Sequence, residues 1–89
     1  MARIVKEIVV KNAQGLHARP AALFVQIASR YNSEVTIQKD DERVNGKSIM
    51  GLLMLGVQPG VKVILDVEGE DADKVLPELE ELLTKGILE

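Results

Sequence analysis

With 89 residues, a formal net charge of −3 and no cysteine, the chain has the composition of one small acidic domain over residues 1–89. The lack of cysteine excludes disulfides and thiolate metal sites and fits a reducing cytoplasm. Nucleic-acid binding is disfavoured because the chain is acidic and its aromatic residues are limited to Phe24 and Tyr31. We find no leader and no apolar run of spanning length, so we expect a cytoplasmic location and no membrane insertion.

The first half of the chain alternates between strand and helix patterns. Residues 3–11 are rich in Val and Ile and predict a strand, followed by a turn. From Ala18 to about Tyr31, apolar side chains recur at helical spacing and predict an amphipathic helix. Alternating segments around residues 35–38 and 43–44 predict a second strand and a short third strand.

The second half begins with a short apolar run that has a capping residue at each end. Ser48 precedes residues 49–55 and Gly56 follows them, which predicts a short capped helix. Residues 61–67 then alternate between apolar and charged side chains and predict a fourth strand.

The last element is predicted to be a helix from about Asp71 to Lys85. Pro77 lies past its first turn, where proline costs ~3 kcal/mol, so we expect one helix with a bend. Because each predicted strand has one apolar face, the chain favours an α+β fold with an antiparallel sheet covered by helices on one side.

The only histidine of the chain, His17, lies in the segment Gly15-Leu16-His17-Ala18-Arg19-Pro20. Glycine permits a turn that other residues would strain, and proline is tolerated in the first turn of a helix. His17 is therefore predicted to open the helix that follows. A helix start gathers unsatisfied backbone amides and the positive end of the dipole, so it is suited to an anion. An imidazole there would be a nucleophile next to a site that favours phosphate binding.

Each of these residues also has a plainer interpretation. A single histidine near a helix start is more often a cap or a surface residue, and Arg19 alone is an ordinary solvated charge. As an N-cap, Ser48 is fully explained by structure. Ile49, Met50 and Leu53 are at a spacing more typical of a core than of an interface.

Two segments together resemble a known family. Gly15-Leu16-His17-Ala18-Arg19-Pro20-Ala21-Ala22, followed by Lys47-Ser48-Ile49-Met50-Gly51, is similar to HPr, the histidine phosphocarrier of the bacterial sugar phosphotransferase system, and the second segment is similar to its Gram-positive branch. The resemblance implies an open-faced β-sandwich, βαββαβα, with four antiparallel strands in the order 1-4-2-3 beneath three helices. It spans essentially the whole chain.

The resemblance also implies a function for His17. This residue would accept a phosphoryl group from enzyme I at ring atom Nδ1 and donate it to sugar-specific enzyme IIA components. The amides of Ala18 and Arg19 and the Arg19 guanidinium would bind the phosphate. No cofactor or metal is expected in the chain. In some relatives the terminal carboxylate, here Glu89, lies near the site.

The segment around Ser48 implies regulation. Its phosphorylation would add about two negative charges beside a helix start and repel an acidic partner. HPr kinase/phosphorylase and the catabolite repressor CcpA would then be partners. An exposed apolar patch for partner docking is expected from residues of both helices: Leu23, Ile49, Met50, Leu53 and Gly56.

Three hypotheses follow: a phosphocarrier acting through His17, a regulatory binding module acting through phosphorylated Ser48 in catabolite repression, and an interaction domain with neither chemistry. Relatives of the second kind lack this histidine, so the presence of His17 counts against that hypothesis. A monomer is the default expectation.

Overall fold

The structure, a computed structural model, describes residues 2–86; the expectation for Glu89 lies outside them. In chain order the elements are β1 (Ala2–Val9), α1 (Ala18–Ser29), β2 (Glu34–Lys39), β3 (Glu42–Asn45), α2 (Ile49–Leu55), β4 (Lys62–Gly69) and α3 (Ala72–Lys85). The order βαββαβα is the predicted one. Within this part of the chain, no helix has the length and apolar character needed to cross a membrane.

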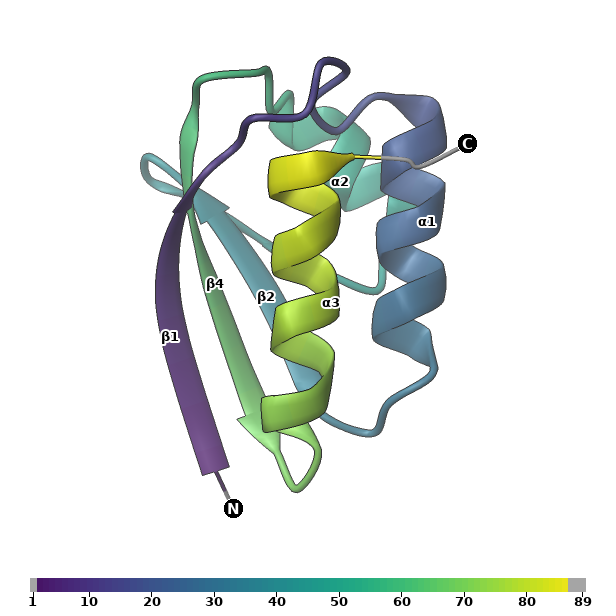
Figure 1. The fold of residues 1–89 in the computed structure, drawn as a ribbon, viewed down its shortest axis with the longest axis vertical. Helices are drawn as coiled ribbons and strands as arrows, with labels where there is room; N and C mark the ends of the chain where they lie inside the picture. Colours follow the sequence, from purple (N-terminus) through teal and green to yellow (C-terminus); the bar gives the residue numbers. More distant parts are fainter. Residues whose placement is uncertain (1, 87–89) are drawn as a thin grey trace.

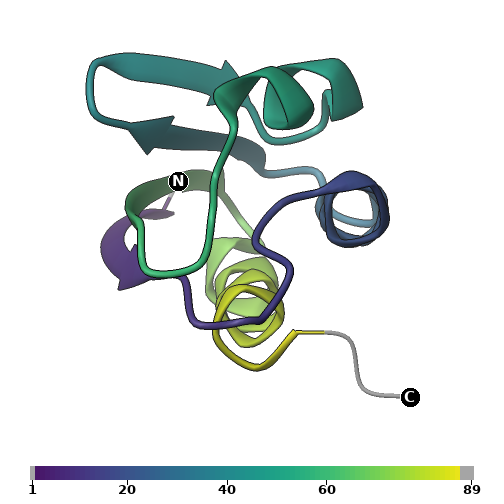
Figure 2. The ribbon, with the colours of Figure 1, turned by 90° about the horizontal axis from the view of Figure 1, so that it is seen from above.

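The four strands form one antiparallel sheet in the order β1-β4-β2-β3. Seen from two directions, the helices lie against one face of this sheet and the other face is open (Figures 1 and 2). The predicted α+β class and strand order are therefore confirmed.

The core lies between the sheet and the helices, and the residue periodicity explains it. Alternate residues of β2 and β4 point inward, and the apolar stripes of α1 and α3 pack on them. The largest side chains that are fully buried there include Phe24, Ile37, Leu65, Leu79 and Leu83.

Helix α1 ends at Ser29, two residues before the predicted end at Tyr31. Tertiary hydrogen bonds account for the difference. The Tyr31 carbonyl accepts from Lys47 Nζ at 2.8 Å. The amides of Asn32 and Ser33 both donate to the Asp71 carboxylate at 3.0 Å. These bonds hold the chain in a turn after the helix.

Asp71 is the N-cap of α3, as the sequence indicates, but its side chain makes no cap hydrogen bond. Its carboxylate instead holds the loop between α1 and β2. Those hydrogen bonds lower the pKa of Asp71. The one from the Ser33 hydroxyl has the largest effect. Pro77 lies inside α3, which continues across it as one helix; the bend stays a prediction.

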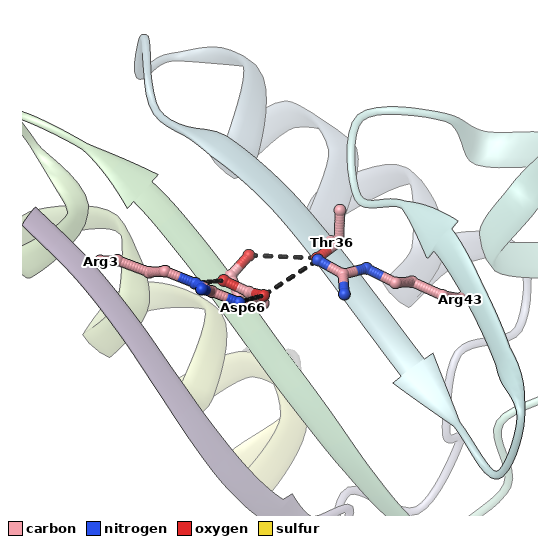
Figure 3. A network of polar contacts seen from close by, with 4 residues as sticks. All are labelled: Arg3, Thr36, Arg43 and Asp66. Carbon is pink, nitrogen blue, oxygen red and sulfur yellow. Dashed lines mark hydrogen bonds and ion pairs between the residues drawn. The ribbon is translucent and has the colours of Figure 1, made fainter. Parts of the chain in front are cut away.

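A charged network on the open sheet face joins strands that are far apart in sequence. Asp66 on β4 accepts from Arg3 Nε at 3.0 Å and Arg3 Nη2 at 2.8 Å, and from Arg43 Nη2 at 2.9 Å. Figure 3 shows the two guanidinium groups reaching this carboxylate from β1 and β3. The Asp66 side chain is only 11% exposed. The hydrogen bond from Arg3 is the main reason that the pKa of Asp66 is lowered.

We predict that Asp66→Asn removes an acid-sensitive part of the stability. Because the pKa of Asp66 is lower in the folded state, its contribution is complete above the ordinary carboxyl value of about 3.9 and is lost as the pH falls through the lowered value. Urea unfolding at several pH values should show the variant less stable than the wild type at pH 7, with the difference shrinking in acid. Glu70→Gln, at an exposed carboxylate just after β4, is the control. A difference that stays constant with pH would contradict this role.

Candidate functional site

His17 is the N-cap residue of α1, and its backbone is extended, with φ −75° and ψ −174°. The predicted position at the opening of a helix is thus confirmed. The His17 carbonyl accepts from the Ala21 amide at 2.8 Å. The side chain is exposed and makes no cap hydrogen bond to the helix. The backbone therefore starts the helix while the imidazole faces solvent.

The two residues before His17 fix where the helix begins. Gly15 has φ +58°, a conformation that favours glycine, and a Cβ at this position would collide with the Val57 carbonyl. The amide of the buried Leu16 donates to that same carbonyl at 2.9 Å. Because Val57 directly follows the Gly56 cap of α2, this bond ties the start of α1 to the end of α2.

The start of α1 is suited to binding an anion. Ala18 and Arg19 are exposed, and the first turn contains no acidic residue. Within residues 2–86, the Ala18 amide donates no hydrogen bond. Pro20 has no amide proton, so no donor is lost by its place in the first turn. An anion near His17 would meet aligned backbone dipoles and lie near the Arg19 guanidinium.

Beside this helix start lies a cleft of about 350 Å³. Two cationic side chains, Arg19 and Lys85, line it together with Asn12, Ala13, Gln14, Pro20 and Gly86. The cleft thus brings the end of α3 next to the loop that carries His17. Among the described residues, no group of three or more His, Cys, Asp or Glu could hold a metal ion.

Helix α2 has the predicted bounds and the predicted caps. Ser48 Oγ accepts from the Gly51 amide at 3.1 Å, and Gly56 has φ +68° at the other end. The sequence did not indicate a third cap: Lys39 Nζ donates to the carbonyls of Leu55 at 3.2 Å and Gly56 at 3.4 Å. A cation at a helix C-terminus is favourable for the helix dipole.

An apolar patch is exposed on α2, and we call Ile49, Met50, Leu53 and Met54 the α2 patch. Met50 is 63% exposed and Met54 is 76% exposed. Met54 is not among the docking residues predicted from the sequence, although it lies four residues after Met50 on the same helix face. Leu23 is half-buried and packs against the core, so it offers less surface.

The patch and His17 lie at the same end of the molecule. Helices α1 and α2 contact each other, and the views in Figures 1 and 2 place α2 beside the first turns of α1. Gly56 is also exposed there, and a Cβ placed on it would contact only the Met54 carbonyl oxygen, at 4.0 Å. A partner approaching His17 can therefore reach the α2 patch; its docking role stays a prediction.

We predict that Ser48→Ala lowers the free energy of unfolding by about 1 kcal/mol, because the Gly51 amide loses its acceptor. Urea unfolding measures the change. Ser29→Ala, at an exposed serine that ends α1, should have a much smaller effect. Equal stability of Ser48→Ala and the wild type would show that the cap contributes nothing.

Fold and site together define a small α+β protein that presents one exposed histidine at a helix start. The family profile described as "PTS HPr component phosphorylation site" matches residues 4–85. The chain belongs to the HPr family of the phosphotransferase system.

Individual relatives support the assignment of the chain to the HPr family. The HPr-like protein Crh of Bacillus subtilis is 49% identical over 74 residues, which cover 83% of this chain and 87% of Crh. The phosphocarrier protein HPr of Borreliella burgdorferi is 44% identical over 78 residues, which cover 88% of this chain and 91% of that protein. The chain is thus similar both to carriers and to a protein named only as HPr-like.

Solved structures show the same fold. HPr from Bacillus anthracis matches with a TM-score of 0.88 and 41% identity over 93% of this chain and 99% of that one. An HPr dimer from Thermoanaerobacter tengcongensis matches with a TM-score of 0.76 and 48% identity over 92% of this chain and 94% of that one. Because that relative is described as a dimer, the expected monomer stays a prediction.

Proposed function

We propose that this chain is a phosphocarrier of the sugar phosphotransferase system that carries the phosphoryl group on His17. It accepts the group from phosphorylated enzyme I and donates it to sugar-specific enzyme IIA components. The observation that carries the proposal is the exposed imidazole at the N-cap of α1 in a chain of the HPr family. A carrier that serves two proteins in turn needs a site that both can reach.

The geometry supports the transfer step through position and charge. Nδ1 of His17 attacks phosphorus as the bond from phosphorus to the donor breaks, and the reverse exchange occurs with the acceptor. Charge on the phosphoryl oxygens is stabilised by the Ala18 amide and by the amide and guanidinium of Arg19. In-line transfer needs little else from the protein, because positioning and charge stabilisation supply most of the catalysis.

Docking would use the surface next to His17. The α2 patch supplies flexible apolar side chains, which suit a domain that meets several partners. Leu23 borders this surface from α1, and Gly56 lets a partner backbone approach closely. Enzyme I, enzyme IIA and HPr kinase/phosphorylase would then share one face of the molecule.

Ser48 would regulate this docking. Its hydroxyl is at the start of α2, directly before the α2 patch. A phosphate there adds negative charge beside the apolar surface and repels an acidic partner, while the nearby helix amides stabilise the modified serine. The phosphorylated form would then be the one that binds the repressor CcpA.

The first prediction for this function is phosphorylation of His17 by enzyme I and phosphoenolpyruvate. The native chain should gain one acid-labile, base-stable phosphoryl group, and His17→Ala should gain none because it lacks the nucleophile. Labelled phosphoenolpyruvate with electrophoresis measures this. Ser48→Ala is the matched control and should be labelled like the native chain. Label on His17→Ala would mean that another residue carries the phosphate.

The second prediction concerns Ser48 and separates the carrier from a purely regulatory module. Incubation with ATP and HPr kinase should give an acid-stable adduct that is absent from Ser48→Ala. The 49% sequence identity to Crh is a reason to test whether the chain is a regulatory module. A chain labelled at Ser48 by ATP but never at His17 by phosphoenolpyruvate would be a regulatory module. An unlabelled native chain in the ATP reaction would count against regulation at Ser48.

A further inference from the structure

Asn12 is a buried polar residue in the loop that leads to His17. It is 4% exposed, and its side-chain Nδ2 donates to the Gly15 carbonyl at 3.1 Å. The Gly15 amide in turn donates to the Asn12 carbonyl at 3.4 Å. The side chain therefore closes a turn whose last residue lies two positions before His17.

The peptide group that links Gly15 to Leu16 is held from both sides. Its carbonyl oxygen accepts from Asn12 Nδ2, and its amide donates to the Val57 carbonyl at 2.9 Å. A peptide group is planar, so two hydrogen bonds in opposite directions fix its orientation. The direction in which the next residues leave this plane decides where the His17 imidazole lies.

Asn12 is itself anchored to the end of α3. The amides of Lys11 and Asn12 both donate to the Leu83 carbonyl, at 2.9 and 3.2 Å. Gly86 packs so closely that a Cβ on it would lie 2.9 Å from Asn12 Cβ. The residue that holds the Gly15 carbonyl is thus itself bound to the end of α3 and not only to its own loop.

Folding stability alone does not explain an asparagine at this position. Within residues 2–86, its buried Oδ1 accepts no hydrogen bond. A buried polar atom without a partner is unfavourable, and an apolar side chain would avoid that cost. What an apolar side chain lacks is the donor that reaches the Gly15 carbonyl.

We propose that Asn12 is a positioning residue for phosphoryl transfer at His17. Its amide locks the Gly15–Leu16 peptide group, which aims the imidazole at the incoming phosphorus. The inference rests on the proposed function of His17. Because the Asn12 side chain is buried, it does not touch a partner protein, and its effect is on the transfer step rather than on docking.

The test compares Asn12→Ala and Asn12→Asp with Ser33→Ala in steady-state transfer from enzyme I. Asp has nearly the shape of Asn but has no amide donor for the Gly15 carbonyl. Ser33 is the matched control, because it is also buried and hydrogen-bonded through its side chain but lies in the loop between α1 and β2, at the opposite end of the molecule. We expect kcat to fall roughly tenfold in both Asn12 variants, with KM for enzyme I unchanged, since small misplacements of reacting groups are costly.

A second readout follows the loop itself. Hydrogen exchange of the Leu16 amide, measured by NMR, should be faster in Asn12→Ala than in the wild type and unchanged in Ser33→Ala. An unchanged kcat in both Asn12 variants, a change confined to KM, or an equal loss of kcat in Ser33→Ala would overturn the inference. A native chain that enzyme I labels normally would leave the function of His17 intact in that case. A native chain that is not labelled would remove both proposals.

Discussion

The hydrogen bond from the Leu16 amide to the Val57 carbonyl joins the start of α1 to the end of α2. It fixes where α1 begins, and it does so against the residue that follows the cap of α2. His17 and the α2 patch therefore have a defined relation to each other. The glycine at position 15 is required because any side chain there would collide with the same carbonyl.

The start of α1 differs in composition from the rest of this acidic chain. The chain carries a formal net charge of −3, yet the first turn of α1 has no acidic residue and includes Arg19. The start of α1 is therefore suited to binding an anion, although the molecule as a whole is acidic. Under the proposed function, the apolar side chains exposed on α2 would offer a docking contact that does not depend on charge. A phosphate on Ser48 would change the charge of that docking surface without altering the site on α1.

Features that depend on residues close together in the chain could be predicted from the sequence. The caps of α2 at Ser48 and Gly56 could be predicted because each acts within one turn of the helix. The contacts of Asp66 could not, since Arg3 and Arg43 reach it only through the strand order β1-β4-β2-β3. The sequence places Asn12 in the turn after residues 3–11, but its bond to Gly15 and its anchor at Leu83 depend on packing and could not be predicted. The positions of His17 and Ser48 are confirmed, whereas their phosphorylation stays a proposal.

The most direct test of the central claim is nitrogen-15 and phosphorus-31 NMR of the chain after reaction with enzyme I and phosphoenolpyruvate. The account predicts phosphorus bonded to Nδ1 of His17, with the amide resonances of Ala18 and Arg19 shifted because they donate to the phosphoryl oxygens. Phosphorus on any other residue would contradict it. So would a phosphorylated His17 whose neighbouring amides keep their original resonances.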